Sequence, residues 1–170
     1  MLSKLGLKPG GVFLDVGCGD GFFAIPAAIE VGPKGLVYGV DASPEALDSL
    51  KSHAANEGLS NIRLLFADAT EAEICRACVD VALMANVLHD FNYPLKVLSQ
   101  VRTALKPGGM LAVLDWKKSP MLHGPSPAKR LDVSQATDLI QKAGFEVTNV
   151  GESGRFHYFI LAVSPVVATA

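Results

Sequence analysis

Short apolar runs alternate with amphipathic stretches along most of this chain of 170 residues. Apolar runs bounded by Gly, Pro or polar residues predict buried strands, and longer stretches with apolar residues three to four apart predict helices. The predicted strands are 12–16, 36–40, 62–66, 79–84, 110–115, 145–150 and 156–163. The predicted helices are 21–31, 44–57, 93–105 and 133–143.

The order of these elements predicts the fold class. Ser43 is a good helix N-cap before Pro44, and Gly58 and Gly144 lie where helices should end. Strands joined by single helices indicate right-handed crossovers and a parallel sheet covered on both faces. The segment 151–155 is too short for a crossover, so the last two strands should pair antiparallel. We expect one α/β domain over residues 1–170, a three-layer sandwich.

Three glycines follow the first predicted strand in the sequence LDVGCGDG, residues 14–21. In open α/β sheets the first strand-to-helix turn approaches the ligand most closely, and glycine allows both unusual dihedrals and backbone contact. Gly17, Gly19 and Gly21 therefore predict a ligand at this turn. The alternative is a tight turn that serves only to pack the helix on the strand.

The spacing of the glycines narrows the class of ligand. The dinucleotide pattern G-x-G-x-x-G would need a glycine where Phe22 stands, and no Lys-Ser or Lys-Thr pair completes a P-loop. Asp15 and Asp20 add negative charge where a pyrophosphate would prefer positive charge. These observations favour a ligand with a cationic or ammonium end, although Asp15 could instead bond nearby backbone.

The chain resembles the class I S-adenosylmethionine-dependent methyltransferases along almost its whole length. The motifs that carry the resemblance, in order, are LDVGCGDG, VYGVDAS, FADAT, DVALMANVLHDF, LKPGGMLAVLDW, and FEV followed by FHYFILAV. The resemblance implies a mostly parallel, seven-stranded sheet in the order 3-2-1-4-5-7-6 with the last strand antiparallel. It also implies S-adenosylmethionine as the cofactor, and the motifs look closest to the quinone and small-metabolite branch.

Individual residues are assigned to the cofactor partly by position and partly by this resemblance. Asp41 ends the second predicted strand, where a carboxylate can accept both ribose hydroxyls, while Ser43 is better placed as the helix cap. By resemblance, Asp68 and the Ala69 N–H meet adenine, and Asn86 offers main-chain contacts to the methionine portion; both polar side chains could instead cap turns. The full predicted cofactor set is Asp15, Gly17, Gly19, Gly21, Asp41, Ala42, Asp68, Ala69 and Asn86.

His89, followed by Asp90, is the candidate catalytic residue. Methyl transfer from a sulfonium is an in-line displacement that mainly needs alignment and exclusion of water. A base helps only if the acceptor loses a proton, and histidine has a suitable pKa. A capping or packing role for His89 is an open alternative. His53 and His157 are expected on a solvated helix face and in a strand.

Other reactive residues give weaker signals. Cys75 and Cys78 lack the two further ligands of a zinc site, so no metal is expected, and they are interpreted as two ordinary thiols or, alternatively, a local disulfide. The loop 117–130 contains four basic residues that could meet an anionic acceptor or simply be solvated. Trp116 at its base could line the acceptor site or fill the loop.

Composition and charge limit the partners. A net charge of −2 gives no overall attraction to nucleic acid, and the sequence 86–89 lacks the Pro-Pro-aromatic pattern of base-methylating relatives. No apolar run is long enough to span a membrane and the start lacks a signal peptide, so we expect a cytoplasmic protein. Only about ten residues precede the first strand, which predicts an open site covered by a homo-oligomer partner or by the substrate.

We therefore expect a methyltransferase acting on a small-molecule acceptor. Two alternatives stay open. A non-catalytic module that binds S-adenosylmethionine or S-adenosylhomocysteine would keep Gly17, Gly19 and Asp41. A nicotinamide-dependent oxidoreductase would share the sheet but wants the glycine missing at position 22.

Overall fold

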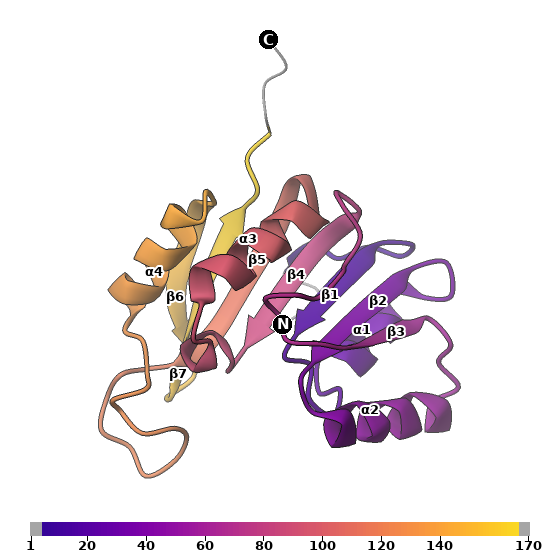
Figure 1. Ribbon diagram of the computed structural model, residues 1–170, viewed down its shortest axis with the longest axis horizontal. Helices are drawn as coiled ribbons and strands as arrows, with labels where there is room; N and C mark the ends of the chain where they lie inside the picture. Colours follow the sequence, from indigo (N-terminus) through magenta and orange to yellow (C-terminus); the bar gives the residue numbers. More distant parts are fainter. Residues whose placement is uncertain (1–4, 167–170) are drawn as a thin grey trace.

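A computed structural model describes residues 5–166, which form one mixed sheet with helices on both faces (Figure 1). The strand order is β3-β2-β1-β4-β5-β7-β6, with β7 antiparallel to both of its neighbours. This confirms the predicted topology. The strands are β1 (Val12–Val16), β2 (Leu36–Asp41), β3 (Ile62–Phe66), β4 (Val79–Ala85), β5 (Leu105–Trp116), β6 (Glu146–Ser153) and β7 (His157–Val163). The helices are α1 (Ala24–Val31), α2 (Pro44–Asn56), the short 3-10 turn η2 (Leu88–Asp90), α3 (Pro94–Ala104) and α4 (Val133–Lys142).

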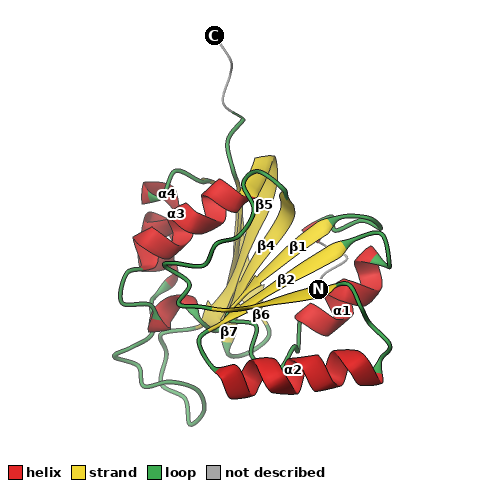
Figure 2. Ribbon diagram, turned by 45° about the vertical axis from the view of Figure 1, so that its right-hand side comes forward, coloured by secondary structure: helices red, strands yellow, loops and turns green. Residues whose placement is uncertain are grey.

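The helices form two layers with the sheet between them, as Figure 2 shows. Helices α1 and α2 pack on one face, where Phe13, Leu50 and Leu83 are fully buried. Helices α3 and α4 pack on the other, where Leu98, Ile140 and Ile160 are fully buried. Burial of strands on both faces explains the high apolar content, because the central strands have no solvent side to carry polar residues.

Several predicted boundaries are wrong by a few residues. Strand β5 begins at Leu105, directly after α3, because Leu105 pairs with Val79 ahead of the register shift that follows. Helix α1 begins three residues later than predicted, since the glycine turn occupies the preceding positions. Strand β6 runs three residues further than predicted and β7 begins one residue later, so only residues 154–156 lie between them.

The predicted N-cap of α2 and the predicted glycines after α2 and α4 are confirmed. The Ser43 hydroxyl accepts a hydrogen bond of 3.1 Å from the Ala46 N–H, so Ser43 is the N-cap of α2. Gly58 (φ +66°) and Gly144 (φ +88°) follow α2 and α4 in the left-handed conformation that glycine adopts at low cost.

The sulfur atoms of Cys75 and Cys78 are joined in a disulfide, with their Cα atoms 5.9 Å apart. The interpretation of this pair as two separate thiols is therefore wrong, and the alternative of a local disulfide holds. The disulfide lies just before β4, at the end of the sheet opposite the glycine turn, because β1 and β4 run parallel. Within residues 5–166, no helix has the length and apolarity required to cross a bilayer.

Candidate active site

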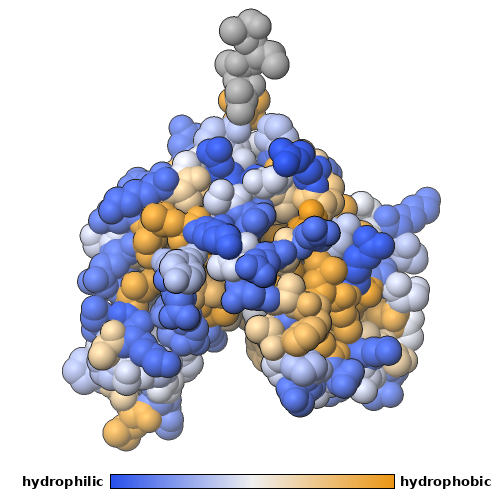
Figure 3. All heavy atoms as spheres, in the orientation of Figure 1, coloured by the Kyte–Doolittle hydropathy of each residue, from blue (hydrophilic) through white to orange (hydrophobic). Residues whose placement is uncertain are grey.

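The glycine turn leaves the carboxyl end of β1 at the point where the strand order reverses, between β1 and β4. A cavity of about 440 Å³ opens beside it. Figure 3 shows the molecule hollowed along its lower edge, between the lobe that carries the 117–130 loop and the lobe that carries α2. The residues lining the cavity are Asp15, Gly17, Cys18, Gly19, Asp20, Phe22, Phe23, Ala85, Asn86, Leu114 and His157.

Each of the three positions in the turn requires glycine for a different physical reason. All have positive φ, but a Cβ at Gly17 would lie 2.6 Å from the Cγ2 atom of Val87, and one at Gly21 would overlap the Leu50 side chain. These two positions are closed by the protein's own packing. A Cβ at Gly19 would meet no atom within 4 Å. Gly19 therefore borders open space, and Gly21 lies outside the cavity lining.

Asp15 places a carboxylate in the cavity wall with one oxygen unpaired. Its side chain is 2% exposed, and Oδ2 is buried with no hydrogen-bond partner among the described residues. Burial, with the nearby charge of Asp41 adding to it, raises the pKa of Asp15 to about 7. A buried unpaired oxygen is costly, so a cationic donor in the cavity would relieve both the missing hydrogen bond and the unfavourable ionisation.

Asp41 holds the turn in place from the end of β2. Its Oδ2 accepts the Gly19 N–H at 2.8 Å, and its Oδ1 accepts the Ser43 N–H at 2.9 Å. Each carboxylate oxygen can accept more than one hydrogen bond, so both remain able to accept from a ligand. The carboxylate thus fixes the backbone of Gly19, the glycine of this turn that faces open space.

The other predicted cofactor residues are spread along the same edge of the sheet. Asp68 is exposed, and its Oδ1 accepts the Thr70 N–H at 2.7 Å. Hydrogen bonding from the Thr70 side chain, together with this backbone bond, lowers the pKa of Asp68. It therefore forms the Asx-type turn that was the alternative interpretation. Asn86 lines the cavity with φ +58°, a left-handed conformation that asparagine tolerates better than most residues. Ala42, Asp68 and Ala69 follow β2 and β3 and lie outside the cavity lining.

His89 is engaged with two carboxylates rather than with the cavity. Its side chain is buried, Nδ1 lies 2.7 Å from the Asp115 Oδ1, and Nε2 lies 3.3 Å from the Asp90 Oδ2. The hydrogen bond to Asp115 raises the pKa of His89 above its ordinary value, which favours the imidazolium form. This ion pair fastens η2, after β4, to the end of β5. The catalytic role of His89 stays a prediction.

His157 is a site residue that sequence analysis missed. It opens β7 and lines the cavity, and its ring packs against Trp116 with the ring centroids 4.2 Å apart. The position could not be read from the sequence, because it depends on the antiparallel register that pairs His157 with Trp116 across β5 and β7. The only local signal is its place at the start of a predicted strand.

The loop 117–130 is built around a buried cation. Arg130 is 1% exposed, and its guanidinium donates to the carbonyl oxygens of the four loop residues Lys117, Ser119, His123 and Pro125. The interpretation of Arg130 as part of a solvated or anion-binding cluster is therefore wrong. Gly124 lies directly against the Trp116 ring, so Trp116 fills the base of the loop.

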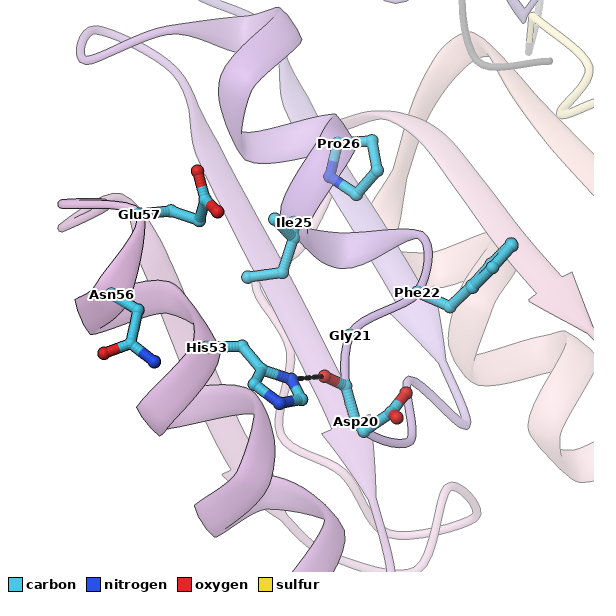
Figure 4. Close-up of a pocket in the computed structure, with 8 residues that line it drawn as sticks. All are labelled: Asp20, Gly21, Phe22, Ile25, Pro26, His53, Asn56 and Glu57. Atoms are coloured by element: carbon cyan, nitrogen blue, oxygen red, sulfur yellow. Dashed lines mark hydrogen bonds between the residues drawn. The ribbon is translucent and has the colours of Figure 1, made fainter.

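A second cavity, of about 400 Å³, lies on the other side of the glycine turn (Figure 4). Its walls come from the turn, from α1 and from the end of α2, and Phe22 lines both cavities. His53 reaches from α2 to the turn, with Nδ1 3.0 Å from the Asp20 carbonyl oxygen. His53 is exposed on its helix, as predicted.

Comparison with known proteins identifies the family. A family model described as a methyltransferase domain matches residues 7–150. The chain belongs to the methyltransferase domain family. The chain is 31% identical to a SAM-dependent methyltransferase from Aquifex aeolicus, whose crystal structure superposes with a TM-score of 0.90 over 98% of this chain and 87% of that one.

Two curated relatives have names that state their acceptors. A demethylmenaquinone methyltransferase of Geobacillus kaustophilus is 30% identical over 73% of this chain and 53% of its own length. An arsenite methyltransferase of Halobacterium salinarum is 30% identical over 64% of this chain and 28% of its own length. The chain thus spans about half of the first of these relatives and about a quarter of the second.

Proposed function

We propose that the protein transfers the methyl group of S-adenosylmethionine to a small organic acceptor bound at the carboxyl ends of β1, β4 and β5. The observation that carries the proposal is the unpaired, buried Oδ2 of Asp15 on the wall of the cavity beside Gly19. S-adenosylmethionine supplies an α-ammonium group for this oxygen and an activated methyl group for the reaction. The open space beside Gly19 and the carboxylate of Asp15 both fit this cofactor.

Every predicted cofactor residue except Gly21, which faces Leu50 and lies outside the cavity lining, has a proposed role. Asp15 pairs with the ammonium group, and the open space at Gly19 admits the cofactor against the backbone. Asp41 accepts from the ribose with the lone pairs that Gly19 and Ser43 leave free. The remaining proposed contacts are Gly17 and Asn86 with the methionine portion, and Ala42, Asp68 and Ala69 with the nucleoside.

The methyl transfer requires little from the protein beyond positioning the acceptor and the cofactor. Because the methyl group is already activated on a sulfonium, the rate depends on holding the acceptor in line with the breaking bond and on excluding water. Phe22, Phe23 and Leu114 contribute apolar surface to the cavity. A flat, largely apolar acceptor would be held in this way.

The positions of the cysteines favour an organic acceptor over arsenite. Trivalent arsenic is a soft centre that prefers thiolate ligands. Cys18 lines the cavity but is 5% exposed, and burial raises the pKa of its thiol, which opposes thiolate formation. Cys75 and Cys78 are joined to each other at the far end of the sheet. The cavity therefore lacks a cluster of available thiolates.

Turnover with defined acceptors tests the proposal. The protein is incubated with methyl-labelled S-adenosylmethionine and, separately, reduced demethylmenaquinone, arsenite, and a low-molecular-weight cell extract. We expect S-adenosylhomocysteine to accumulate together with a labelled organic product, and no product with arsenite. Tight binding of the cofactor with no transfer to any of the three would identify a binding module instead.

Replacement of Asp41 tests the cofactor site separately from the acceptor. Asp41→Ala should weaken S-adenosylhomocysteine binding by about 1 to 3 kcal/mol, because charge-assisted hydrogen bonds to the ribose are lost along with the hold on Gly19. Isothermal titration calorimetry measures the change. Asp48→Ala, at an exposed position on α2, is the matched control and should bind as the native protein does. Unchanged affinity in Asp41→Ala would contradict the assignment.

A further inference from the structure

His157 lies where an acceptor would meet the protein. It is the first residue of β7, and together with Leu114 of β5 it lines the cavity on the side formed by these strands. The glycine turn and Asp15 line the same cavity from β1 and the start of α1. With the cofactor on the glycine turn, His157 belongs to the wall that remains for the acceptor.

The His157 ring is held by packing but has no polar partner. The indole of Trp116 lies against it at a tilt of 42°, and this contact restricts the ring. No hydrogen bond joins either ring nitrogen to any residue in the range 5–166, and Nε2 is buried. An unpaired ring in a cavity wall leaves a hydrogen-bonding position for a ligand group.

Burial favours the neutral form of His157. Desolvation lowers the pKa of His157 below its ordinary value of 6.5, the charge of Asp115 opposes this shift, and the weaker effect of Lys117 adds to it. Lys117 itself pairs with Glu152 of β6 at 2.9 Å, and Asp115 is already bonded to His89. A neutral imidazole at pH 7 can accept a proton, whereas the pKa of His89 is shifted the other way.

We propose that His157 is the general base of the reaction, and that the acceptor carries an ionisable O–H or N–H group that points at its ring. This inference rests on the proposed function, because it needs an acceptor in the same cavity. As the acceptor's electron pair forms the bond to the methyl carbon, the pair of the broken C–S bond stays on the departing thioether sulfur. The acceptor's proton passes to the His157 ring and from there to water.

A pair of histidine variants tests the role in turnover. His157→Gln keeps a polar side chain but cannot take up a proton, so the single-turnover rate with reduced demethylmenaquinone or the extract should fall at least about 100-fold. S-adenosylhomocysteine affinity should stay within about twofold. His123→Gln, at an exposed position in the 117–130 loop, is the matched control and should keep the native rate.

The pH dependence separates a base from a structural residue. With S-adenosylmethionine saturating at every pH, so that Asp15 does not limit binding, the native rate should rise with pH through an apparent pKa below 6.5, and this step should be absent from the residual rate of His157→Gln. Circular dichroism checks that the variant is folded, and His157→Asn replaces it if it is not. A rate within threefold of the native value, or a retained pH step, would overturn the proposal.

A second measurement needs neither acceptor nor cofactor. Titration of the ¹⁵N-labelled imidazoles in the protein alone, followed by NMR and assigned with His157→Gln, should show His157 neutral at pH 7. A His157 ring that is protonated at pH 7 overturns the proposal whatever the turnover data give. If the native protein methylates none of the probes, the proposed function fails, and the titration still decides whether His157 can act as a base.

Discussion

At the scale of single residues, two glycines of the same turn have different roles: Gly19 leaves space for a ligand, and Gly21 allows close packing. Gly19 faces open space, whereas Gly21 faces Leu50. Gly19→Val should therefore abolish S-adenosylhomocysteine binding by filling the ligand's space, while the melting temperature falls only by the modest cost of its positive φ.

Gly21→Val is the matched comparison at the other end of the turn. Its side chain would collide with Leu50, which is fully buried in the core below α2, so the variant should unfold at a much lower temperature. Calorimetry and thermal denaturation together distinguish the two effects. Intact cofactor binding in Gly19→Val would show that this space is not used by the ligand.

Asp15 links cofactor binding to pH. Because its pKa is raised to about 7 in the free protein, Asp15 is largely protonated at pH 6 and must lose its proton to pair with an ammonium group. S-adenosylhomocysteine affinity should therefore fall as pH drops below about 7, approaching tenfold per pH unit, with a proton released on binding.

Calorimetry in buffers of different ionisation enthalpy measures this proton. Asp15→Asn keeps the shape of the side chain but cannot ionise, so it should bind weakly and lose the pH dependence that belongs to residue 15. The account is contradicted if native affinity stays constant between pH 5.5 and 8, or if Asp15→Asn follows the same pH curve as the native protein.

At the scale of elements, the 117–130 loop depends on one side chain. The buried guanidinium of Arg130 satisfies four loop carbonyls, and Trp116 supports the loop from β5. Arg130→Ala should leave those carbonyls unpaired and release the loop from its fixed shape. Limited proteolysis should then cut within this segment at a rate well above that of the native protein.

Lys118→Ala provides the control for the loop. Lys118 is exposed and bonds only the Gln135 side chain, at 3.3 Å, so its removal should leave the proteolysis rate unchanged. Equal resistance of Arg130→Ala and the native protein to cleavage would contradict the role assigned to Arg130. The four basic residues of this loop look alike in sequence, and only the fold distinguishes the buried Arg130 from the half-buried Lys117 and the exposed Lys118 and Lys129.

The elements themselves were largely predictable from local pattern. Strands β1 and β3 match their predicted bounds, because each is a short, mostly apolar run that is recognisable in the local sequence. The end of α3 could not be predicted in this way. Leu105 leaves the helix to pair with Val79, and a pairing partner distant in sequence leaves no mark on the local pattern. The position of His157 in the cavity wall could not be predicted for the same reason, because it is set by the register with Trp116.

At the scale of the whole molecule, the strand order brings the predicted residues to one edge of the sheet. The order predicted from family resemblance is confirmed, and it puts the ends of β1, β2 and β4 side by side. Asp15, Asp41 and Asn86 therefore lie near one another although their sequence positions are far apart. The hydrogen bond from Gly19 to Asp41 could not be predicted, since it depends on how the turn closes.

The crystal structure of the protein with S-adenosylhomocysteine tests the central claim most directly. The account predicts the ligand in the cavity beside Gly19, its ammonium nitrogen within hydrogen-bond distance of the Asp15 Oδ2, and its ribose hydroxyls on Asp41. A ligand bound elsewhere on the molecule, or an Asp15 Oδ2 that stays without a partner in the complex, would contradict it.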